Sequence, residues 1–115
     1  MDINKGSIGL MNAGLKGLAI EQKVILHNLA NLDTPGYKAK RVSFENVLND
    51  ESSRYDLKAS VVSDDATSIR ADGNNVNTDT ESLKLYDNYL RQLYIYQKIS
   101  GRMSNMRYIL NQSAK

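Results

Sequence analysis

Apolar residues recur at alternating steps of three and four along the first third of the chain. This spacing is a heptad repeat, and seven of its eight positions are apolar, with Gln22 as the exception. A period of 3.5 residues predicts an α-helix whose apolar seam packs against a helical partner. The apolar members of this first seam are Ile8, Met11, Leu15, Leu18, Ile25, Leu29 and Leu32.

A second heptad seam of the same length runs through the last third of the chain. Seven of its eight positions are apolar or aromatic, and Gln92 is the exception. Thr78 or Thr80 is expected to cap this helix, while Asp79 and Glu81 suit the positive end of the helix dipole. The members of this second seam are Leu85, Tyr89, Tyr96, Ile99, Met103, Met106 and Leu110.

Neither helix can bury its seam alone. Gly14 and Gly17 each weaken the first helix by about 1 kcal/mol relative to alanine, so that helix is expected to depend on a partner. The seams are either core faces of an ordinary helical bundle or surfaces for association between molecules, and the heptad regularity favours the second interpretation. Further apolar residues lie off the second seam and imply additional neighbours: Leu83, Tyr86, Leu90, Leu93 and Ile109.

The segment between the seams is acidic and rich in turn residues. Its first part is expected to form a short helix or turn, a weak alternation predicts one strand, and the long polar stretch is a candidate for disorder or a mobile loop. The predicted fold class is therefore mainly α, with long N- and C-terminal helices that pair as a coiled coil. The middle segment between them is expected to be partly irregular or disordered, or to contain a short β element. The residues concerned are Val42, Phe44, Val47 and Leu48 for the helix or turn, and Tyr55, Leu57, Ala59 and Val61 for the strand.

The 115 residues allow at most one compact domain. Residues 1–41 are expected to form the N-terminal helix and the turn that follows it, and residues 79–115 the C-terminal helix. These two parts would make one domain, with residues 42–78 as an acidic, variable insertion.

A turn is predicted where the first seam ends. Thr34 precedes the chain's one proline and is therefore driven out of helical geometry. Pro35 and Gly36 suit the second and third positions of a type II turn, because the third position needs a positive φ. Asn28 and Asn31 can bond to the turn backbone through their amides. Turn chemistry explains each of these residues, so the segment is interpreted as a helix stop.

Charge is distributed unevenly although the net charge is only +2. Residues 1–41 carry six basic and three acidic groups, residues 42–83 three and nine, and residues 84–115 six and one. These blocks either remain solvated or pair within the chain or between neighbours. A nucleic-acid binder would instead concentrate a strong positive excess on one surface, so no nucleic-acid partner is expected.

Candidate chemistry is sparse in this sequence. The absence of cysteine excludes disulfides, thiolate zinc sites and cysteine nucleophiles. His27 has no second histidine with which to bind a metal, and a calcium loop centred on Gly73 would place Ser68 and Arg70 where ligands are needed. The basic cluster of Lys38, Lys40 and Arg41 is either solvated or faces an acidic neighbour or a phosphate. We therefore expect neither enzymatic activity, nor a cofactor, nor a metal.

Two motifs resemble signatures of flagellar axial proteins. Asn28-Leu29-Ala30-Asn31, followed after two residues by Thr34-Pro35-Gly36-Tyr37, is similar to the N-terminal signature of rod and hook proteins. The run Asp72-Gly73-Asn74-Asn75-Val76, followed by an acidic helix start, resembles a signature of the proximal rod class, the FlgB family. The motif residues are Asn28, Ala30, Asn31, Thr34, Pro35, Gly36, Tyr37, Asp72, Gly73, Asn74, Asn75 and Val76.

This resemblance implies a structural subunit of the flagellar basal body. In the family the terminal helices form a coiled coil and pack with other subunits into the periplasmic, torque-transmitting rod. The implied partners are the chain itself, other rod proteins, the adaptor between the MS ring and the rod, and the export apparatus. Export by the flagellar type III apparatus fits the lack of an apolar leader or membrane span. The alternatives are another rod or hook component, or a soluble helical adaptor that never polymerises.

Overall fold

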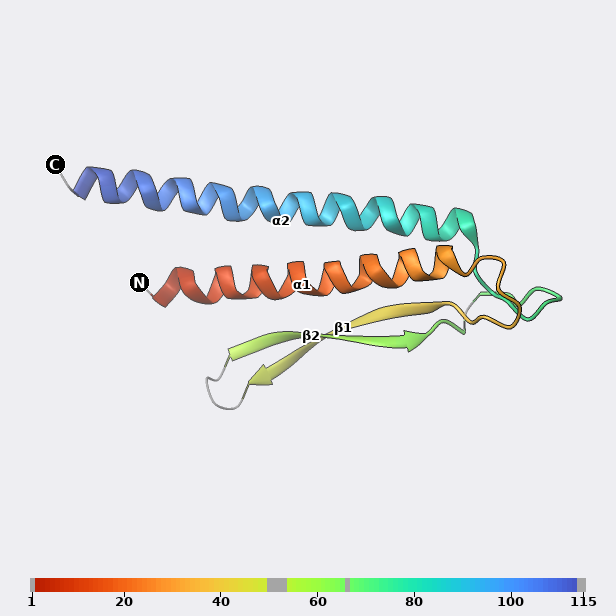
Figure 1. The fold of residues 1–115 in the computed structure, drawn as a ribbon. Helices are drawn as coiled ribbons and strands as arrows, with labels where there is room; N and C mark the ends of the chain where they lie inside the picture. The colour runs from red at the N-terminus through yellow and green to blue at the C-terminus, as the bar shows by residue number, and fades with distance from the viewer. Residues whose placement is uncertain (1, 50–53, 66, 114–115) are drawn as a thin grey trace.

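The computed structural model describes residues 2–49, 54–65 and 67–113, with side chains for 8–45, 58–65 and 67–113. Helix α1 spans Asp2–Ala30, strands β1 and β2 span Lys40–Asn49 and Arg54–Ser63, and helix α2 spans Thr78–Ser113. The two helices run antiparallel, and α1 lies between α2 and the β-hairpin (Figure 1). The molecule is long and flat, measuring 70 × 31 × 16 Å.

The helix pair confirms the predicted fold class. Helix α1 packs against α2 along their length, and a side-chain carbon placed on Gly14 would lie 3.5 Å from Cδ1 of Ile95. A mainly α fold with paired terminal helices was expected because both seams repeat every seven residues. Together the helices account for most of the chain and carry its long axis (Figure 1).

The end of α1 differs from its predicted position. The seam indicated a helix reaching Leu32, but α1 ends at Ala30. The amides of Leu32 and Thr34 donate to the carbonyls of Leu29 and Asn31, at 3.2 and 3.1 Å, so the chain tightens into three-residue turns after the helix. The expectation that Leu32 continues the helix is therefore wrong, because local turn bonds replace the helical ones there.

The start of α2 is capped by an asparagine. The expectation that Thr78 or Thr80 is the cap is wrong, because Oδ1 of Asn77 accepts a hydrogen bond from the Thr80 amide at 3.2 Å. Asparagine is among the best N-cap residues, since its short side chain reaches the free amides of the first turn. Asp79 and Glu81 lie in that first turn, as predicted from the helix dipole.

The middle of the chain forms an antiparallel hairpin. β1 pairs with β2 in a register that places Lys40 opposite Ser63 and Phe44 opposite Ala59. The predicted strand is confirmed, but the helix or turn expected over residues 42–48 is wrong. Val42 is buried, Ser43 and Phe44 are half-buried, and Phe44 lies against Gly17 of α1. The side chains of residues 47, 48, 55 and 57 lie outside the described part of the chain.

The buried core is small and unusually polar. Five apolar residues of the described chain are buried, and six polar or charged residues are buried with them. The largest side chains with less than 2% exposure are all asparagines, Asn28, Asn74 and Asn88. Specific hydrogen bonds, together with apolar packing, therefore hold these elements in place. The buried apolar residues are Leu18, Ile25, Ala39, Val42 and Val76.

Candidate functional site

The turn after α1 has the geometry that its sequence predicts. The amide of Tyr37 donates to the carbonyl of Thr34 at 3.2 Å, which closes a four-residue turn. Gly36 occupies the third position with a φ of +74°, the conformation that a type II turn requires. The predicted turn is confirmed, and it fixes the direction in which the chain leaves α1 for the hairpin.

The second motif packs directly against this turn. The Gly36 amide donates to the carbonyl of Asp72 at 2.8 Å. Lys38 donates through Nζ to the carbonyl of Gly73, which has a φ of +82°. The structure therefore brings the two sequence motifs together, although more than thirty positions separate them. We call residues 28–39 and 70–77, which meet here, the motif junction.

Asn74 holds the turns that follow α1. Its fully buried amide nitrogen lies 2.9, 3.1 and 2.8 Å from the carbonyl oxygens of Asn31, Leu32 and Thr34. Its Oδ1 accepts from the Val76 amide at 2.7 Å. These carbonyls belong to the turns that follow α1, and a residue from far along the sequence supplies their hydrogen-bond donor.

Asn75 ties the base of the hairpin to the motif junction. Its Oδ1 accepts from the amide of Ala39 at 2.6 Å, and its Nδ2 donates to the carbonyl of Asp64 at 2.8 Å. The Asp64 amide in turn donates to the Ala39 carbonyl at 2.9 Å. Ala39 precedes β1 and Asp64 follows β2, so one side chain holds both ends of the hairpin.

Asn28 links α1 to β1 and α2. Its Nδ2 donates to the Lys40 carbonyl at 2.7 Å and to Oε2 of Glu81 at 3.1 Å. Its Oδ1 accepts from the Lys40 amide at 3.0 Å and from the Tyr37 hydroxyl at 2.9 Å. Four bonds use the full capacity of a primary amide, and Asn28 is completely buried. This residue therefore joins three elements at one point.

The bonds around Asn28 also assign a proton on His27. Because the carbonyl of Lys40 can only accept, Nδ2 of Asn28 faces it, and Oδ1 faces Tyr37. The Tyr37 hydroxyl must then donate to Asn28, so Nδ1 of His27, 2.9 Å from that hydroxyl, donates to it. Burial, followed by the nearby charge of Glu81, raises the pKa of Tyr37 above its usual value of 10.0. The phenol is therefore held in its neutral form.

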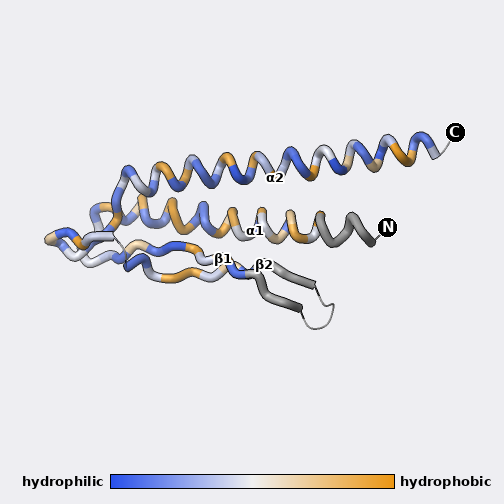
Figure 2. Tube along the Cα trace, turned by 180° about the vertical axis from the view of Figure 1, so that it is seen from behind, coloured by the Kyte–Doolittle hydropathy of each residue, from blue (hydrophilic) through white to orange (hydrophobic). Residues whose placement is uncertain are grey.

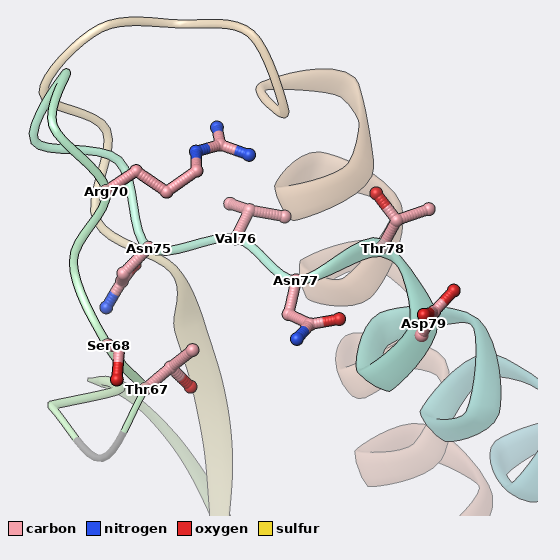
Figure 3. Close-up of a pocket in the computed structure, with 8 residues that line it drawn as sticks. All are labelled: Thr67, Ser68, Arg70, Asn75, Val76, Asn77, Thr78 and Asp79. Atoms are coloured by element: carbon pink, nitrogen blue, oxygen red, sulfur yellow. The ribbon is translucent and has the colours of Figure 1, made fainter.

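A hollow of about 430 Å³ opens beside the motif junction. Figure 3 shows the segment from Asn75 to Asp79 along one wall, where it continues into the first turn of α2. Thr67, Ser68 and Arg70 line it from the loop after β2. Among the side chains that the structure describes, no three of His, Cys, Asp or Glu converge as a metal site would require. The described part of the chain also contains no helix apolar and long enough to cross a membrane.

The structure divides the second seam into an inner and an outer half. Leu85, Ile99 and Met106 are half-buried, whereas Tyr89, Tyr96, Met103 and Leu110 are each more than half exposed. One position before Tyr89, Tyr96 and Met103, the residues Asn88, Ile95 and Arg102 occupy the inner side. The positions of α2 that are buried or half-buried at heptad spacing are Glu81, Leu85, Asn88, Gln92, Ile95, Ile99, Arg102 and Met106.

The first seam is covered more completely. Leu18 and Ile25 are buried, and the remaining members of the seam are half-buried, because α1 packs against both α2 and the hairpin. The remaining members are Ile8, Met11, Leu15, Leu29 and Leu32. The apolar surface left open therefore lies mainly on α2.

An exposed apolar band follows α2 along its length. Figure 2 shows hydrophobic positions recurring from its first turns to its C-terminal end. The exposed seam residues Tyr89, Tyr96, Met103 and Leu110 form one line, and Tyr86 and Leu93 widen it. We call these six residues the outer face of α2. A hollow of about 420 Å³ beside it is lined by Leu26 of α1 together with Tyr86 and Tyr89.

Comparison with known proteins gives consistent matches. A family model described as Flagella basal body rod protein matches residues 12–38, which include the first motif. The flagellar basal body rod protein FlgB of Bacillus subtilis (strain 168) is 34% identical over 125 residues, covering 96% of this chain and 97% of that protein. The proteins of the same name from Borrelia hermsii and Escherichia coli (strain K12) are 31% and 29% identical, covering 84% and 83% of their own lengths.

Proposed function

The chain belongs to the FlgB family of flagellar basal body rod proteins, and we propose that it is a structural rod subunit that joins its neighbours through the outer face of α2. Membership rests on an identity of 34% across nearly the whole of both chains. The structural role follows from the family. The outer face is our assignment, and it is argued from exposure.

The observation that carries this assignment is the exposed half of the second seam. Tyr89 and Tyr96 are 62% and 56% exposed, and Met103 and Leu110 are 51% and 55% exposed. Residues seven apart lie on one side of a helix, so these four form a continuous line that no part of the described chain covers. Contiguous exposed apolar surface marks association, and tyrosines supply large contact areas.

Helix α1 and the motif junction would support this surface from behind. The first seam, from Ile8 to Leu32, is at most half exposed, so we assign its residues to holding α2 in position as well as to contacts with neighbours. Asn74 and Asn75 tie the loop before α2 to the end of α1 and to the base of the hairpin. A subunit braced in this way can transmit load, because many modest packing contacts add up.

We extend the proposal to location and partners on the basis of family membership. The subunit would lie in the periplasmic rod, reach it through the flagellar type III apparatus, and contact other rod proteins, further copies of itself, and the adaptor at the rod base. We propose no catalytic role. The first and last thirds of the sequence would make one structural unit, with the hairpin as an insertion.

The test is incorporation of an outer-face variant into basal bodies. A chain carrying Tyr89→Ser, Tyr96→Ser and Met103→Ser would be produced in cells lacking the wild-type gene. The matched control carries Gln97→Ser, Asn105→Ser and Asn111→Ser, which are also exposed on α2.

We expect both variants to keep the helix content of the wild type by circular dichroism and to be exported equally. The outer-face variant should be missing from purified basal bodies, and its cells should not swim, whereas the control should be incorporated. Normal incorporation of the outer-face variant would contradict the proposed interface. A wild-type chain that is exported but never found in basal bodies would favour a soluble adaptor instead.

A further inference from the structure

Two polar layers built on buried asparagines interrupt the contact between α1 and α2, beside an exposed hydrogen bond from Gln92 to Gln22 at 3.1 Å. In one layer, Nδ2 of Asn28 donates to Oε2 of Glu81 at 3.1 Å. In the other, Nδ2 of Asn88 donates to Oε1 of Glu21 at 3.0 Å. Asn28 and Asn88 have no exposed surface, and Glu81 is 2% exposed. Each layer therefore pairs one buried amide with one carboxylate across the helices.

The two layers occupy equivalent places in the heptad. Asn28 and Glu21 are seven residues apart on α1, and Glu81 and Asn88 are seven apart on α2. The next contact along the same line is the packing of Gly14 against Ile95. The order of the groups is reversed between the layers, because α1 supplies the amide in the first and the carboxylate in the second.

This arrangement makes the two neighbouring heptad registers unfavourable. Sliding α2 by seven residues in one direction would place Glu21 opposite Glu81, so two carboxylates would meet inside the contact. Sliding it in the other direction would place the half-buried Glu21 opposite Ile95, which cannot donate a hydrogen bond, so its carboxylate would lose the Asn88 amide. The native register satisfies both carboxylates.

The same layers disfavour pairing between identical helices. A parallel, in-register pair of α2 helices from two copies would place Glu81 against Glu81 and Asn88 against Asn88. A parallel pair of α1 helices would do the same with Glu21 and Asn28. Polar residues at core positions of coiled coils are known to select register and partner at some cost in stability.

We propose that Asn28, Glu81, Glu21 and Asn88 are the specificity-determining residues that direct α2 onto the α1 of its own chain in one register. This inference deepens the proposed function, because a subunit that assembles through helices must distinguish its own seam from those of its neighbours. With these layers in place, the side of α2 that carries Glu81 and Asn88 would pair with α1 of the same chain. The outer face of α2 would then remain available for association with other subunits.

The first test exchanges the two groups of one layer. Asn88→Glu alone would place two carboxylates together, and we expect it to lower Tm by at least about 10 °C. Adding Glu21→Asn restores one amide and one carboxylate but not the Asn88 bond to the Leu18 carbonyl, and we expect Tm to recover by at least about 5 °C. If Asn88→Glu does not fold, folding of the double variant alone supports the proposal. A double variant no more stable than Asn88→Glu overturns it.

The second test removes the same layer by Glu21→Leu with Asn88→Leu. Because the chain has no cysteine, Lys16→Cys and Gln97→Cys can carry two spin labels on exposed positions of α1 and α2. A shift of one heptad moves the helices by about 10 Å. We expect the variant to remain helical but to show a second distance population and a dimer in sedimentation.

The control for this experiment exchanges one apolar side chain on each helix, Ile25→Leu on α1 with Ile95→Leu on α2, and should keep one distance and the monomer. A leucine-layer variant with the wild-type distance and mass would overturn the proposal. All these measurements use the isolated chain, so a failure here leaves incorporation into basal bodies unaffected. Conversely, absence of the wild-type chain from basal bodies would leave the register results intact.

Discussion

Gly73 lies against Gly36, and a side-chain carbon built on Gly73 would be 3.3 Å from the Cα atom of Gly36. Both glycines have positive φ angles, +74° for Gly36 and +82° for Gly73. The two motifs therefore meet backbone to backbone, and the Gly36 amide bonds to Asp72 across this contact. Close approach explains the glycine of the second motif, and turn geometry explains that of the first.

Alanine should be more damaging at Gly73 than at Gly36. Both substitutions force a side chain into the left-handed region, at a cost of about 1 to 2 kcal/mol. A carbon on Gly36 meets nothing within 4 Å, whereas one on Gly73 presses on the backbone of Gly36. We expect urea unfolding to give a larger loss for Gly73→Ala. Equal losses of unfolding free energy for Gly73→Ala and Gly36→Ala would contradict this expectation. The contact of Gly73 with the Gly36 backbone would then add no cost beyond that of the positive φ.

Removal of the Asn28 amide should destabilise the whole molecule. Asn28→Ala leaves the buried Glu81 carboxylate and both peptide groups of Lys40 without this partner. Each buried polar group left unpaired costs about 1 to 3 kcal/mol, so we expect a total loss of about 3 kcal/mol or more in the free energy of unfolding. Asn12→Ala is the matched control, because Asn12 is exposed on the same helix. It should change stability by less than about 0.5 kcal/mol.

The hairpin depends on the absence of a side chain at Gly17. Phe44 packs onto the backbone of α1 there, and a carbon on Gly17 would lie 2.5 Å from its Cε1 atom. Gly17→Ala should therefore lower the free energy of unfolding, although alanine favours a helix by about 1 kcal/mol. In a chain that already carries Phe44→Ala, the same substitution should become stabilising. Stabilisation by Gly17→Ala in both backgrounds would show that Phe44 does not lie against the helix.

Gly9→Ala provides the reference for helix propensity. A carbon on Gly9 meets nothing within 4 Å, so this substitution should raise the free energy of unfolding by up to about 1 kcal/mol. Gly9 and Gly17 both lie on α1, so the difference between their Gly→Ala changes in unfolding free energy measures the contact of Gly17 with Phe44.

Tyr37 should make stability fall at alkaline pH. Its pKa is raised in the folded chain by burial and by Glu81, so the folded state holds the phenolic proton more tightly than the unfolded state. Its contribution is complete below the unfolded pKa of about 10 and is lost as the pH rises through the folded pKa. The difference in unfolding free energy between wild type and Tyr37→Phe should therefore be constant below about pH 9 and shrink above pH 10. A difference that is constant up to pH 12 would contradict the raised pKa.

The sequence predicted the parts of the fold that depend on local pattern. The two seams gave both helices, and Pro35 with Gly36 gave the type II turn, because period and backbone restriction act over a few residues. The hairpin was only half predicted. Val42 and Phe44 alternate in a stretch too short to separate strand from helix, and their role appears only when they lie on α1.

The interior of the helix pair could not be predicted from hydropathy. In the sequence, Tyr89 and Tyr96 complete an apolar heptad. In the structure, Asn88 and Ile95, one position earlier, face α1. Glu21 and Asn28 similarly lie on the side of α1 that faces α2. A polar residue is stable at these positions because its partner lies across the contact, and that complementarity depends on both helices at once. The meeting of the two motifs was missed for the same reason, since Asn74 and Asn75 find their partners more than ten residues away.

The most direct test of the proposed assembly surface is a map of the intact basal body at side-chain resolution. We predict that Tyr89, Tyr96, Met103 and Leu110 of each copy are covered by side chains of an adjacent subunit, while Asn28 and Asn88 keep their bonds to Glu81 and Glu21 within the chain. A map in which this line of α2 faces solvent, with neighbours packed on another surface, would contradict the account.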